Sequence, residues 1–135
     1  MRFPHFILLL LLVSGCSNPE YTRGASPVDS IARQFLHSVI QQDTQMMDRA
    51  VSGKAKLLAA SDSLAAVVAY FNGSQPASVE LVSNEVASDE STAGVEHHRL
   101  QYRITFADNR QISYFCQLTA TSRDTTISDF RFRWQ

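Results

Sequence analysis

Apolar residues in the first half of the chain recur with the 3.6-residue period of an α-helix. Ser26 is a suitable N-cap, Pro27 suits the first helical position, and Asp29 suits the positive end of the helix dipole. The spacing therefore predicts a helix that begins at residue 27 and buries one continuous stripe: Val28, Ile31, Ala32, Phe35, Leu36, Val39 and Ile40.

Further helical segments are predicted before residue 73. A short, Met-rich helix should cover residues 44–51 and stop at Ser52-Gly53, and a third helical stretch should begin at Lys54, with a restart at Ser61 or Asp62. Asn72-Gly73 then ends the helical part of the chain.

After residue 73 the apolar period changes from 3.6 to 2, which predicts a meander of strands. The segment Ser78–Val86 contains two pairs of apolar residues that a regular strand would place on opposite sheet faces. We therefore expect a β-bulge near Leu81–Val82, which would bring both pairs onto one face. Three later strands alternate cleanly around residues 99–106, 112–118 and 129–134, with turns between them.

Helices followed by an antiparallel meander predict an α+β fold, in which the N-terminal helices pack on one face of a curved antiparallel sheet of about four strands. Clean alternation implies that only one sheet face is buried. That inner face should be unusually aromatic: Tyr102, Phe106, Tyr114, Phe130, Phe132 and Trp134.

Length and composition narrow the class of protein. The 135 residues suffice for one domain, and 44% hydrophobic residues suffice for a core. Twelve basic against thirteen acidic residues give a net charge of -1, so we expect no nucleic-acid partner held by charge. Two cysteines cannot form a disulfide-rich scaffold, nor a structural zinc site without several histidine ligands.

The first sixteen residues, MRFPHFILLLLLVSGC, have the pattern of an export signal. Arg2 precedes eight consecutive apolar residues, Phe6–Val13. At about 1.5 Å per residue this run covers only roughly 12 Å, which is too short to span a bilayer core of about 30 Å.

Val13-Ser14-Gly15-Cys16 resembles the lipobox of bacterial lipoproteins. The resemblance implies a signal peptide of residues 1–15, cleavage before Cys16, and acylation of Cys16, which anchors the protein to the cell envelope. Ser17 after the cysteine favours the periplasmic side of the outer membrane over the inner membrane. Residues 16–26 would then be a lipidated, flexible tether.

Residues 27–135 resemble the nuclear-transport-factor-2-like (cystatin-like) superfamily, and within it small bacterial lipoproteins of uncharacterised function. The resemblance lies in the opening helix PVDSIARQFLHSVIQQD, the helix ending AYFNG and the final strand ISDFRFRW. It implies a cone-shaped domain with a pocket at its open end. Five residues are our candidates for lining that pocket: Tyr102, Tyr114, Phe130, Trp134 and His98.

Few residues suggest catalysis or metal binding. Cys116 is in phase with apolar neighbours, so we expect a buried free thiol rather than a nucleophile; pairing with another molecule is the alternative. His97 and His98 should point to opposite sheet faces and therefore cannot chelate one ion. Glu96 with His98 is the best acid–base pair, but it lies at a strand end. We predict no catalytic residues, no metal and no cofactor.

The polar face of the predicted sheet carries a cluster of arginines. This face is either simply solvated or a surface that binds a partner. Arginine beside an apolar side chain favours the second interpretation, because arginine is enriched in protein interfaces. The superfamily resemblance adds support, because members of that superfamily often dimerise through this face. The candidate contact residues are Arg99, Arg103, Phe115, Ile127, Arg131 and Arg133.

Together these features predict a lipid-anchored envelope lipoprotein that binds a small ligand, a peptide or an envelope protein without catalysis. The alternative is a small pocket enzyme, hydrolase-like or dehydratase-like, which would need a desolvated carboxylate–His or carboxylate–Tyr pair. A third possible function is that of a purely structural subunit of an assembly.

Overall fold

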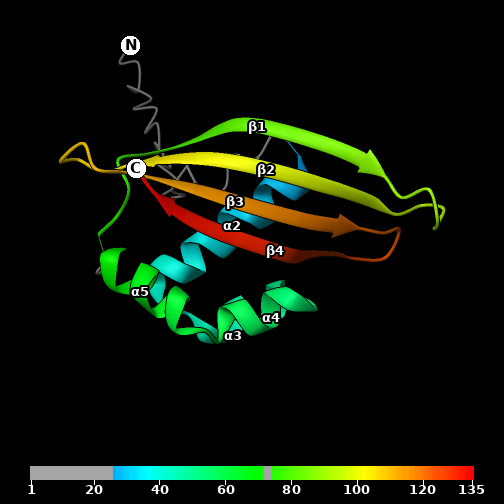
Figure 1. The fold of residues 1–135 in the computed structure, drawn as a ribbon, viewed down its shortest axis with the longest axis horizontal. Coiled ribbons are helices and arrows are strands. Elements are labelled where there is room, and N and C mark those ends of the chain that lie inside the picture. Colours follow the sequence, from blue (N-terminus) through cyan, green and yellow to red (C-terminus); the bar gives the residue numbers. More distant parts are fainter. Residues whose placement is uncertain (1–25, 72–73) are drawn as a thin grey trace, which may run out of the picture.

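The predicted α+β architecture is confirmed (Figure 1). The computed structural model describes residues 26–71 and 74–135, so the signal peptide, Cys16 and most of the tether lie outside the described residues. The described helices precede the sheet: α2 (Pro27–Gln41), α3 (Thr44–Ala50), α4 (Lys54–Ala59) and α5 (Asp62–Phe71). The strands are β1 (Ser78–Ser88), β2 (Glu96–Thr105), β3 (Gln111–Ala120) and β4 (Thr125–Trp134).

Local side-chain caps explain where the helices begin. The Ser26 hydroxyl accepts a hydrogen bond from the Asp29 backbone N–H at 3.3 Å, and Pro27 occupies the first turn of α2. Asp43 caps α3 by accepting from the Met46 N–H at 3.1 Å, and the Ser61 hydroxyl accepts from the Leu64 N–H at 3.4 Å in the first turn of α5. The predicted N-cap at Ser26 and the predicted restart at Ser61 or Asp62 are confirmed.

The sheet is antiparallel throughout, in the order β1-β2-β3-β4. The register between β1 and β2 shifts between Leu81 and Ser83, which confirms the predicted bulge. The bulge brings Leu81, opposite Tyr102, and Val86, opposite His98, onto the same sheet face.

A second bulge, absent from our prediction, corrects the placement of Ile127. The register between β3 and β4 shifts so that Gln117 pairs with Asp129 but Leu118 pairs with Ile127. Because Ser128 is the extra residue, Ile127 faces inward with Leu118 and is fully buried. The prediction that Ile127 belongs to the exposed partner surface is wrong.

The core lies between the helices and the inner sheet face. Tyr102, Tyr114 and Phe132 form a stacked row across three strands, with ring centroids 5.4 and 4.9 Å apart. Phe35 from α2 packs on Phe130 at 4.9 Å. The far ends of the strands extend past the helices in Figure 1, which leaves Val86 55% exposed on the inner face.

Candidate functional site

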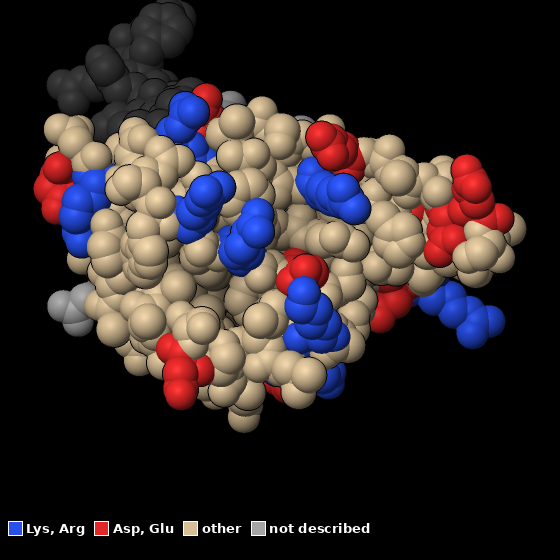
Figure 2. Space-filling model, viewed as in Figure 1, with Lys and Arg blue, Asp and Glu red and all other residues tan. Residues whose placement is uncertain are grey.

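The outer face of the sheet presents polar residues in rows across the strands. In one row the register aligns Arg99, Gln117 and Asp129, and in the next it aligns Phe115 with Arg131. Arg103 and Arg133 both lie opposite Ser113 in a third row. Figure 2 shows lysine and arginine side chains standing over the sheet on this face. The predicted common face of the four arginines and Phe115 is therefore confirmed.

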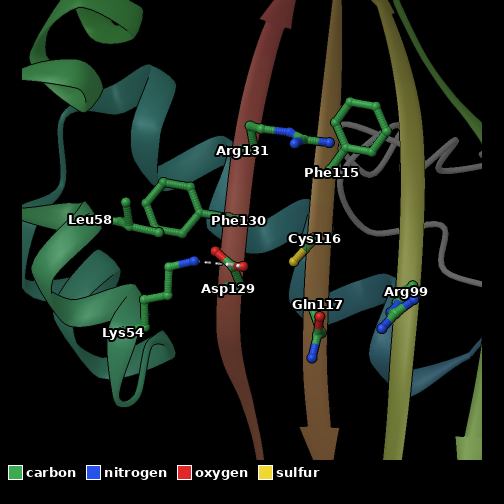
Figure 3. Close-up of a pocket in the computed structure, with 9 residues that line it drawn as sticks. All are labelled: Lys54, Leu58, Arg99, Phe115, Cys116, Gln117, Asp129, Phe130 and Arg131. Atoms are coloured by element: carbon green, nitrogen blue, oxygen red, sulfur yellow. Dashed lines mark hydrogen bonds and ion pairs between the residues drawn. The ribbon is translucent and has the colours of Figure 1, made fainter.

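A pocket of about 340 Å³ opens on this face beside α4 (Figure 3). Arg99, Phe115 and Arg131, each from a different strand, line it together. The remaining lining residues are Lys54, Leu58, Cys116, Gln117, Asp129 and Phe130. The Arg131 guanidinium lies 4.8 Å from the centroid of the Phe115 ring, a cation–π contact that covers this partly exposed apolar side chain.

The charges around the pocket are unevenly compensated. Lys54 Nζ lies 3.4 Å from Asp129 Oδ2, and Arg103 Nη1 lies 3.4 Å from Glu80 Oε2. Within residues 26–71 and 74–135, no carboxylate lies within ion-pair distance of Arg131 or Arg133. The pocket therefore has a net positive character on its β4 side, where the side chains are exposed.

The aromatic residues predicted to line a pocket fall into two groups, those that line a cavity and those that are buried in the core. Phe130 and Trp134 line a second cavity of about 450 Å³, between α5 and β4. Tyr102 and Tyr114 are on the inner face as predicted, but both are fully buried and line neither of the two cavities described above. They are core residues, because α2 covers the part of the sheet that an open cone would leave free.

The two neighbouring histidines occupy opposite faces. His98 is on the inner face opposite Val86, where its side chain is 12% exposed and its Nε2 lies 3.2 Å from Glu96 Oε2. It lines neither of the two cavities described above. His97 is on the outer face and contacts Asp89. Hydrogen bonds from Ser91, together with His97, lower the pKa of Asp89 to about 2.

A buried charged cluster that the sequence pattern did not predict lies between α2 and β2. Asp29 Oδ1 accepts hydrogen bonds from the Tyr102 hydroxyl at 2.5 Å and from Arg33 Nε at 3.0 Å. Arg33 Nη1 also donates to the Val79 carbonyl at 3.0 Å. Burial and the bond to Asp29 raise the pKa of Tyr102, so its hydroxyl remains a donor. The i, i+4 spacing of Asp29 and Arg33 could have revealed the ion pair.

Cys116 is the free cysteine among the described residues, and it is 2% exposed on β3. Burial raises the pKa of its thiol to about 12. A raised pKa keeps the thiol protonated at neutral pH, and the thiolate is the reactive form. The prediction of an inert, buried cysteine is supported by both properties.

We expect Cys116 to resist alkylation by iodoacetamide at pH 8 in the native protein and to react readily in concentrated urea. Mass spectrometry of the peptide that contains Cys116 provides the measurement. Rapid native labelling of this peptide would show that the thiol is accessible and contradict the assignment.

The described part of the chain contains no group of three His, Cys, Asp or Glu side chains placed to hold a metal ion. None of its helices combines the length and the apolar character needed to cross a membrane. Comparison of the chain with models of protein families, with characterised proteins and with solved structures gave no significant match.

Proposed function

We propose that this protein is a lipid-anchored component of the bacterial cell envelope, held at the periplasmic side of the outer membrane by acyl chains on Cys16. Its α+β domain acts as a non-catalytic binding or assembly module, and the arginine-bearing sheet face is the surface that engages the partner. The anchor is supported by the VSGC sequence at residues 13–16 and by the apolar run before it.

The observation that carries the binding role is the convergence of Arg99, Phe115 and Arg131 on one pocket. These residues are separated by up to 32 positions in sequence, yet the strand register places them around the same cavity. Arginine and aromatic side chains are enriched at protein interfaces, where each provides a large contact area at a defined geometry. The exposed arginines of β4 favour a partner or ligand that carries negative charge.

Replacing Phe115 by Asp should strongly weaken capture of the envelope partner, because the substitution removes the apolar contact and adds a negative charge beside Arg131. We expect binding about 30-fold weaker or worse, as for a central interface residue. The measurement is cross-linking in envelope extract followed by mass spectrometry, together with size analysis of the purified protein.

Gln111→Asp is the matched control, since Gln111 lies on the same strand and face as Phe115 but outside the pocket. It should leave the captured partners unchanged. If Phe115→Asp leaves both the partners and the oligomeric state as in the wild type, the sheet face is not the working surface.

A pocket enzyme remains the second candidate, and one observation favours it. Asp29 and Tyr102 form a desolvated carboxylate–Tyr pair of the kind such an enzyme needs. However, Asp29 is paired with Arg33, and neither Asp29 nor Tyr102 lines the outer-face pocket or the cavity between α5 and β4. The pair is therefore better explained as a structural contact between α2 and β2.

A further inference from the structure

The pocket on the outer sheet face adjoins the second cavity. The first, of about 340 Å³, and the second, of about 450 Å³, share three lining residues: Leu58, Phe130 and Arg131. Each volume is in the range of small-molecule sites. The two cavities therefore adjoin at the β4 edge of the sheet, with Arg131 common to both, and together they are called the groove.

The end of the groove between α5 and β4 is apolar. Leu64 and Val67 provide the helix side, and Phe132 and Trp134 provide the strand side. The Trp134 ring packs on Tyr70 with centroids 4.1 Å apart, yet the residue remains 48% exposed. An apolar ligand in this compartment would cover the exposed part of the ring, which is favourable by the hydrophobic effect.

The other end of the groove is cationic. Arg131 and Arg99 both line it, and the carboxylate in this compartment, Asp129, is engaged by Lys54. The Arg131 guanidinium lies 4.8 Å from the centroid of the Phe115 ring, and no carboxylate of the described residues lies within ion-pair distance of it. A planar guanidinium fork matches the two oxygens of a carboxylate better than a lysine would.

We propose that the groove binds an amphipathic carboxylic acid, with its hydrocarbon part between α5 and β4 and its carboxylate at Arg131 and Arg99. This inference rests on the proposed binding function and specifies the class of ligand. Charge complementarity selects an anion, and the adjoining apolar compartment selects an anion that carries a hydrocarbon chain.

The chain contains a single tryptophan, Trp134, so its fluorescence reports directly on the apolar compartment. The full-length protein would be reconstituted in phosphatidylcholine vesicles and titrated with octanoate or with octan-1-ol. We expect octanoate to shift the Trp134 emission to shorter wavelength with saturation. The uncharged alcohol should bind at least tenfold more weakly, because it lacks the charge-assisted bonds to arginine.

Arg131→Gln should weaken octanoate binding about tenfold or more and leave the weaker response to octan-1-ol unchanged. Arg123→Gln, a substitution in the exposed β3–β4 turn, should alter neither response. Circular dichroism would establish that both variants remain folded.

Three results would overturn the proposal: equal affinity for the acid and the alcohol, no effect of Arg131→Gln on octanoate, or no saturable emission change. An emission maximum that depends on protein concentration without octanoate would instead identify a second copy of the chain as the occupant. None of these results affects the partner-capture experiment with Phe115→Asp, so failure here is distinguishable from failure of the binding function.

Discussion

Replacing Asp29 by Ala should lower the free energy of unfolding by about 3–5 kcal/mol, the range observed when one member of a buried ion pair is removed. The substitution removes the Asp29 carboxylate from the Arg33 guanidinium, which is nearly inaccessible to solvent. It also removes the acceptor for the buried Tyr102 hydroxyl, which links α2 to β2. Urea denaturation followed by circular dichroism measures the change.

Asp48→Ala is the control for loss of a carboxylate, because Asp48 is exposed on α3. It should change stability by no more than about 0.5 kcal/mol. A loss below about 1 kcal/mol in Asp29→Ala would show that the Asp29–Arg33–Tyr102 cluster does not hold α2 on the sheet. If Asp29→Ala kept its stability but lost an enzymatic activity that the wild type shows, the pocket-enzyme alternative would be supported instead.

Replacing Cys16 by Ser should release the protein from the membrane fraction completely. The proposed acylation would need a thiol at this position, and each buried CH₂ group of an acyl chain contributes about 0.8 kcal/mol to membrane anchoring. The net charge of -1 offers no strong electrostatic attraction to an anionic membrane in its place. Metabolic labelling with a radioactive fatty acid and sedimentation of membranes measure the two effects.

Cys116→Ala is the matched control, since it removes the other cysteine of the chain. It should retain both the fatty-acid label and the membrane association. Continued labelling and sedimentation of the Cys16→Ser protein would contradict the lipoprotein assignment and, with it, the proposed location.

The helices could be predicted because their signals are local. The N-cap at Ser26 and the apolar stripe of α2 depend on residues three and four apart, and such spacing alone places side chains on one helix face. The bulge at Leu81–Ser83 was also predictable, because it was the simplest way to bring two out-of-phase apolar pairs onto one face.

The errors at Ile127 and at the two tyrosines share a different cause. A strict two-residue alternation through β4 places Ile127 outside, and only pairing with Leu118 shows that Ser128 is an extra residue. Likewise, alternation places Tyr102 and Tyr114 on the inner face but cannot show how closely α2 packs over them.

The α+β class, the order of the elements and the face that carries the arginines and Phe115 could all be inferred from the chain, because periodicity and capping are properties of neighbouring residues. The packed fold was needed to show that Asp29, Arg33 and Tyr102 meet in the interior and that Arg99, Phe115 and Arg131 surround one pocket. These groupings depend on strand register and helix docking, which are fixed by packing between segments distant in sequence.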